Sequence, residues 1–100
     1  MTQEQLTKAV NALKNISINF SLDYYVFKGG CFVRGIFLNN PDEVSKVKSL
    51  LDGDVLKSLK FKKSKAWYLG DEKEVIFMQL KDKIPISIED LEEFQISNYS

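Results

Sequence analysis

The chain has 100 residues, of which 44% are apolar, and its 14 Lys and Arg balance 14 Asp and Glu. A chain of about 100 residues makes one core, so we expect a single domain over residues 1–100, and the zero net charge excludes the whole-chain basic field on which non-specific nucleic-acid binding depends. His is absent, and because His is the usual general acid–base and metal ligand, we predict no enzyme activity, no metal and no cofactor.

The first expected element is an amphipathic helix at about 3–14. Thr2 and Gln5 have the spacing of a capping box, in which each side chain accepts from the backbone of the other. The apolar residues that follow recur at helical spacing: Leu6, Ala9, Val10 and Leu13.

Residues 18–38 change to a period of two and predict a β-hairpin with Gly29-Gly30 as its turn. This register places Phe27 opposite Phe32, Val26 opposite Val33, Tyr25 opposite Arg34 and Leu22 opposite Phe37. One face then carries Phe20, Leu22, Tyr24, Val26, Val33 and Phe37, and the other carries Tyr25, Phe27, Phe32, Arg34 and Ile36. Which face is exposed stays open at this point.

The second half repeats the alternation of helix and hairpin. Asn40-Pro41 starts a helix whose buried stripe is Val44, Val47, Leu50 and Leu51, with Gly53 as its C-terminal cap. Residues 54–62 fit either a helix or a strand. A second hairpin follows, with strands at 66–69 and 74–80 around a turn at 70–73, and Ser87 then caps a short acidic helix near 88–94.

The expected fold is therefore α+β with the order α-β-β-α-β-β-α. Helices pack on one face of an antiparallel sheet of about four to five strands, which makes a two-layer domain.

The first candidate site is the hairpin face with Tyr25, Phe27, Phe32 and Arg34. Tyr, Phe and Arg are enriched at the hot spots of protein interfaces, and Arg34 over Tyr25 would make a cation–π contact. The alternative is that other parts of the chain cover this face.

The second candidate site is the basic stretch 57–68, which lies at the end of a region with seven Lys and two Asp between 46 and 65. Lysines beside aromatic rings suit single-stranded nucleic acid, with charge for the phosphates and rings for the bases. Its candidate residues are Lys60, Lys62, Lys63, Lys65, Trp67 and Tyr68. The alternative is an edge strand that lysines protect against aggregation.

The third candidate is an acidic strip in the last helix, formed by Glu89, Asp90, Glu92 and Glu93. Such a strip would bind a basic groove on a partner, and the alternative is a solvated face whose carboxylates favour the helix N-terminus.

These observations favour a small non-enzymatic protein-binding module. Its more specific form is a phage or mobile-element inhibitor or regulator of a host enzyme or nucleic-acid-binding complex, and the alternative is a single-stranded nucleic-acid-binding module using 57–68. The expected partner is another protein, with a homodimer also considered, nucleic acid less favoured and no membrane. A single Cys and no leader pattern at 1–9 predict a cytoplasmic protein.

Overall fold

The computed structural model describes residues 1–28 and 30–92, without the side chains of Phe27 and Tyr68. The elements are α1 (Gln3–Asn15), β1 (Phe20–Phe27), β2 (Gly30–Leu38), the 3-10 turn η1 (Pro41–Glu43), α2 (Val44–Leu50), α3 (Gly53–Lys57), β3 (Leu59–Tyr68) and β4 (Asp71–Ile86). Residues 88–92 form a further short helix. The strands make one antiparallel sheet with the order β1-β2-β4-β3.

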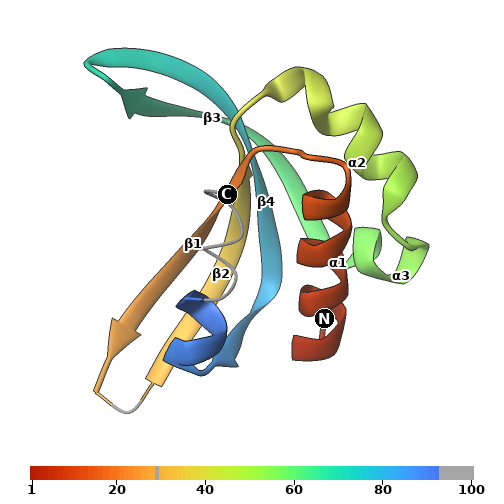
Figure 1. The fold of residues 1–100 in the computed structure, drawn as a ribbon, viewed down its shortest axis with the longest axis vertical. Coiled ribbons are helices and arrows are strands. Elements are labelled where there is room, and N and C mark those ends of the chain that lie inside the picture. The colour runs from red at the N-terminus through yellow and green to blue at the C-terminus, as the bar shows by residue number, and fades with distance from the viewer. Residues whose placement is uncertain (29, 93–100) are drawn as a thin grey trace.

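The described helices lie on one side of this sheet (Figure 1), so the expected α+β arrangement is confirmed with four strands. The core is shared between the two layers, because it contains residues of α1, Val47 of α2, Val55 of α3 and Leu91 of the last helix together with the inward side chains of the strands. No helix in the described part of the chain is long and apolar enough to cross a membrane.

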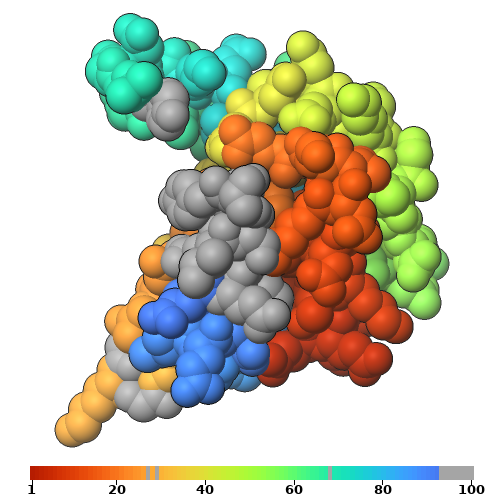
Figure 2. Space-filling model, in the orientation of Figure 1, coloured from red at the N-terminus to blue at the C-terminus, as the bar shows by residue number. Residues whose placement is uncertain are grey.

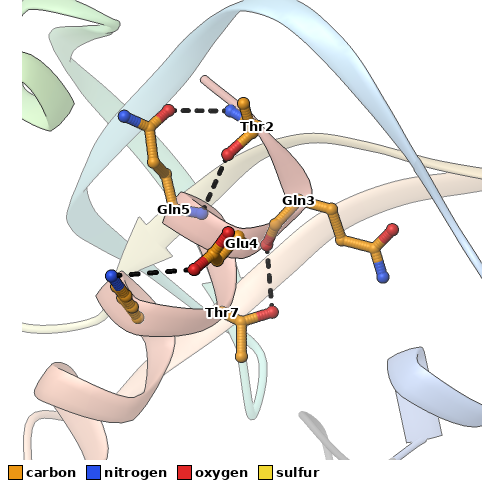
Figure 3. Close-up of polar contacts among 6 residues, drawn as sticks. Thr2, Gln3, Glu4, Gln5 and Thr7 are labelled. Atoms are coloured by element: carbon orange, nitrogen blue, oxygen red, sulfur yellow. Dashed lines mark hydrogen bonds and ion pairs between the residues drawn. The ribbon is translucent and has the colours of Figure 1, made fainter.

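Helix α1 begins as its sequence predicts (Figure 3). Thr2 Oγ1 accepts from the Gln5 backbone N–H at 3.1 Å, and Gln5 Oε1 accepts from the Thr2 N–H at 2.8 Å. The expected apolar stripe, Leu6, Ala9, Val10 and Leu13, is buried. An N-terminal cap of this kind contributes about 1 kcal/mol, and it fixes where the first helical layer starts over the sheet.

The register predicted for the first hairpin is wrong by two residues. Gly30 is the first residue of β2 and pairs with Phe27, so Gly30 belongs to the strand and not to the turn. The pairs near the turn are Tyr25 with Phe32, Val26 with Cys31 and Tyr24 with Val33. A shift of two keeps each side chain on its face, so Tyr25, Phe32 and Arg34 still share one side of the sheet.

A β-bulge changes the register in the half of the hairpin that is remote from the turn. Asp23 pairs with Gly35 while Tyr24 pairs with Val33, which leaves Arg34 as an extra residue in β2. An extra residue reverses the alternation beyond it. Ile36 therefore points into the core, and Phe37 lies on the opposite face, where the sequence had placed Ile36.

The connections in the second half of the chain resolve one open point and differ from two expectations. Residues 54–62, which fitted either a helix or a strand, belong to α3 up to Lys57 and to β3 from Leu59. Gly53 is the first residue of α3 instead of a cap, and Leu51 is the C-terminal cap of α2. The second turn consists of Leu69 and Gly70, both with positive φ (52° and 84°), and not of residues 70–73.

Strand β4 is longer than predicted, because Val33 and Cys31 of β2 pair with Ile84 and Ile86 beyond the expected end at 80. Ser87 caps the last helix as predicted, with its Oγ accepting from the Asp90 N–H at 3.1 Å. Residues 93 and 94 of that expected helix lie outside the described residues.

Candidate functional site on the open face of the sheet

The sheet has a second surface that faces away from the described helices, called here the open face. The strand register shows which residues point to this face, and these residues form rows that run across the strands. The first row is Ser21, Phe37, Phe77 and Lys62, the second is Asp23, Gly35, Gln79 and Lys60, and the third is Tyr25, Phe32 and Pro85. The four rings of these rows belong neither to the core cluster nor to the apolar residues packed against it.

The third row carries an aromatic pair between two cations. The rings of Tyr25 and Phe32 stack with centroids 5.6 Å apart. The Arg34 guanidinium lies 4.8 Å from the Tyr25 centroid, and Lys83 Nζ lies 4.8 Å from that of Phe32. Cations over ring faces are attracted by the ring quadrupole, and here each cation lies over a half-buried aromatic ring.

Arg34 also joins this row to the second one. Its Nη2 donates to Oδ1 of Asp23 at 3.1 Å, and the two side chains are 52% and 24% exposed. Arg34 is the extra residue of the bulge and lies between Val33 and Gly35, which pair with Tyr24 and Asp23. A partly exposed ion pair adds little stability, but this one holds the guanidinium over Tyr25.

A second aromatic pair lies in the first row. Phe37 and Phe77 stack with centroids 4.6 Å apart. The Phe77 ring also lies over Gly35, where an added Cβ would be 2.4 Å from its Cε1. Glycine in a strand often marks a close approach of this kind. The absence of a side chain at Gly35 therefore allows the Phe77 ring to pack against the backbone of β2 beside Phe37.

The basic stretch is divided by strand geometry between two faces. Lys60 and Lys62 lie opposite Gln79 and Phe77 on the open face. Lys63 and Lys65 have the opposite orientation, opposite Ile76 and Glu74, and Lys65 pairs with Glu72 at 3.9 Å. These four lysines therefore do not form one continuous surface.

The remaining residues of that stretch lie near the end of the β3–β4 hairpin, which stands out from the body in Figure 2. Trp67 is 75% exposed on the same side of β3 as Lys63 and Lys65. The side chain of Tyr68 lies outside the description. The open face thus takes two lysines from this candidate site and does not include Trp67.

The acidic strip is exposed but partly engaged. Glu89 and Glu92 are exposed, while Asp90 is half-buried and its Oδ2 accepts from Gln3 Nε2 of α1 at 3.0 Å. This contact anchors the last helix to the first. Glu93 lies outside the described residues, as does the side chain of Phe27 from the aromatic candidate site.

Three residues of the open face were not predicted from the sequence as site residues: Phe37, Phe77 and Lys83. Phe37 was expected on the face of Phe20 and Leu22, and Lys83 follows the expected end of its strand. The signal for Phe37 and Phe77 is Gly35, because an isolated glycine in a strand pattern indicates a bulge or a close backbone contact.

No group of three or more acidic or Cys residues that could hold a metal occurs among the described residues. Cys31 is buried, and loss of hydration raises the pKa of its thiol, which disfavours the reactive thiolate. The open face presents hydrogen-bond donors and positive charges, two of which lie over aromatic rings.

Comparison with protein families, with curated proteins and with solved structures finds no match to this chain.

Proposed function

We propose that the protein is a non-enzymatic binding module whose open face takes an acidic segment of a partner protein. The observation that carries this proposal is the charge of the open face. Arg34, Lys60, Lys62 and Lys83 are exposed on it, and Asp23, the one acidic residue in the described rows, is already paired with Arg34.

The rings support a protein partner better than a nucleic acid. Single-stranded nucleic acid needs free aromatic faces on which its bases stack. Tyr25 and Phe32 stack on each other and lie beneath Arg34 and Lys83, so the groups presented outward are cations. A guanidinium backed by rings suits a carboxylate, and Arg with aromatic neighbours is the usual composition of an interface hot spot.

Two double variants test this proposal with a built-in control. Lys60→Glu with Lys62→Glu reverses two charges on the open face, and Lys63→Glu with Lys65→Glu reverses two on the other face of the same strand. The probe is a fluorescein-labelled poly-glutamate peptide, read by anisotropy across a salt series. We expect the first variant to weaken binding about tenfold, since exposed pairs contribute up to about 1 kcal/mol each, and the second to change it much less.

Tyr25→Ala with Arg34→Ala should also weaken the peptide complex while circular dichroism reports an unchanged fold. Labelled oligo(dT) is measured in parallel. Tighter binding of oligo(dT) than of poly-glutamate, with a steep salt dependence, would favour the nucleic-acid alternative. Equal losses from the two lysine variants would instead show that net charge, and not the open face, governs binding.

A further inference from the structure

The outer part of the β3–β4 hairpin is a ribbon of two strands with an apolar end. Strand β2 pairs with β4 no further along than Ile76, so among the described strands residues 64–75 pair only with each other. At the end of this ribbon Trp67 is 75% exposed and Leu69 is 89% exposed. Leu69 has a positive φ of 52°, a conformation that strains leucine and suits Gly or Asn. The ribbon thus presents apolar side chains to solvent where polar ones would fit the turn better.

The same ribbon carries a cavity of about 120 Å³ beside η1. Its apolar lining comes from Pro41, Val75 and Ile76. Its charged lining comes from the exposed residues Lys63, Lys65 and Glu74. Because a cavity of about 150 Å³ holds a benzene ring, this one has room for the six-membered ring of an indole.

Trp67 and the cavity lie on the same face of the ribbon. Side chains alternate along a strand, so Trp67 shares its orientation with Lys63 and Lys65 of the cavity. Ser64, at the middle of the β3 lining, is three residues from Trp67, which is about 10 Å along a strand. Trp67 is largely exposed, so its ring does not fill the cavity of its own chain.

We propose that Trp67 of a second copy of this chain enters this cavity, and that the contact is reciprocal. A two-fold axis that crosses the ribbon between Trp67 and the cavity exchanges the two. Each copy then gives one ring and receives one, so the assembly closes at the dimer. Lys63 and Lys65 lie around the inserted ring, and Trp is the side chain whose ring attracts cations most strongly.

Charge favours a second copy as the occupant. The exposed charged residues on this face of the ribbon are two cations and two carboxylates: Lys63, Lys65, Glu72 and Glu74. Lys65 and Glu72 already attract one another within one copy, at 3.9 Å. A face with both signs in equal number can meet a copy of itself without net repulsion, as a two-fold contact requires. The basic open face cannot, and the inference does not depend on what that face binds.

The chain contains one Trp, so its fluorescence reports on the proposed contact alone. We expect sedimentation equilibrium to give twice the chain mass of 11.5 kDa. Dilution should return Trp67 to water, which moves its emission to longer wavelength and increases its quenching by acrylamide. A chain that is monomeric at every concentration would overturn the proposal, and so would a dimer whose emission does not change as it dissociates.

Trp67→Ala removes both inserted rings from the dimer. Truncating one hot-spot residue weakens binding by a factor of about 30 or more, so we expect the dimer dissociation constant to rise about a hundredfold or more. Ile88→Ala is the matched control, because it removes another exposed apolar side chain (55%) from the last helix, far from the ribbon end in Figure 1. Circular dichroism checks that both variants fold. A dimer that survives Trp67→Ala would contradict the inference.

The two lysine double variants identify the face that forms the dimer. Lys63→Glu with Lys65→Glu leaves only carboxylates around the cavity and should abolish the dimer. Lys60→Glu with Lys62→Glu, on the open face, should leave it intact. The order of effects is the reverse of that expected for poly-glutamate binding, so failure of the dimer and failure of the proposed function are distinguishable. Equal effects of the two variants on the dimer would refute the assignment to this face.

Discussion

Gly35→Ala tests whether the bulge and the Phe77 ring shape the open face. A Cβ at Gly35 would lie 2.4 Å from Cε1 and 2.7 Å from Cζ of Phe77, and 2.6 Å from the carbonyl oxygen of Met78. The ring can turn away. The carbonyl cannot, because it belongs to the backbone of β4, so the added methyl group must separate β2 from β4 where Gly35 pairs with Gln79.

The size of the effect follows from this contact. Adding a methylene to a packed region costs about 1–3 kcal/mol, and in a domain of about 100 residues each kcal/mol lowers the melting temperature by roughly 4–8 °C. We therefore expect Gly35→Ala to melt roughly 4–24 °C below the wild type. Because Phe77 also stacks on Phe37, a displaced ring should weaken binding at the open face as well.

Gly53→Ala is the matched control, measured by thermal and urea unfolding followed by circular dichroism. A Cβ at Gly53 meets no atom within 4 Å, and this residue begins α3. Alanine there lowers the entropy of the unfolded chain and is expected to be neutral or to stabilise by up to about 1 kcal/mol. Equal unfolding free energies for the two variants would refute the close contact between Gly35 and β4.

Two further predictions concern single residues. Leu69→Asn should raise the urea midpoint, with a stabilisation of about 0.5–1 kcal/mol, because Asn tolerates the positive φ of 52° that strains leucine; an unchanged or lower midpoint would contradict this assignment of the turn. Burial raises the pKa of the Cys31 thiol, so its contribution to stability is complete below the pKa of the unfolded thiol and is lost as the pH rises towards the folded one. The unfolding free energy should fall at alkaline pH, and a thiol reagent such as DTNB should react with Cys31 only as fast as the chain opens; rapid labelling of the native chain would count against this.

Local patterns were enough to predict the elements that depend on local interactions. The cap of α1 and its stripe of four apolar residues both occur as expected, because a capping box and a period of 3.6 need no distant partner. Ser87 starts the last helix for the same reason. The grouping of Tyr25, Phe32 and Arg34 on one face was also predicted correctly, since a register error of two residues preserves strand faces.

Register and strand ends were not predictable in the same way, because they depend on contacts between distant segments. The Gly29-Gly30 dipeptide allows several turn positions, and pairing of Phe27 with Gly30 decides among them. The bulge at Arg34 depends on β1 and β4 together, since the pairing shifts in both ladders at this point. Ile36 and Phe37 consequently lie on the faces opposite to those predicted.

The lysine stretch shows why the net charge of a sequence segment does not predict the charge of one face of a sheet. Successive strand residues point to opposite faces, so a run of lysines in sequence is not a patch in space. Lys60 and Lys62, two residues apart, join Arg34 and Lys83 from other strands on the open face, while Lys65 meets Glu72 on the opposite side. The net charge of zero is therefore compatible with a basic face of the sheet. Because side chains alternate between faces along β3, Lys60 and Lys62 lie on this face, and Lys63 and Lys65 lie on the other.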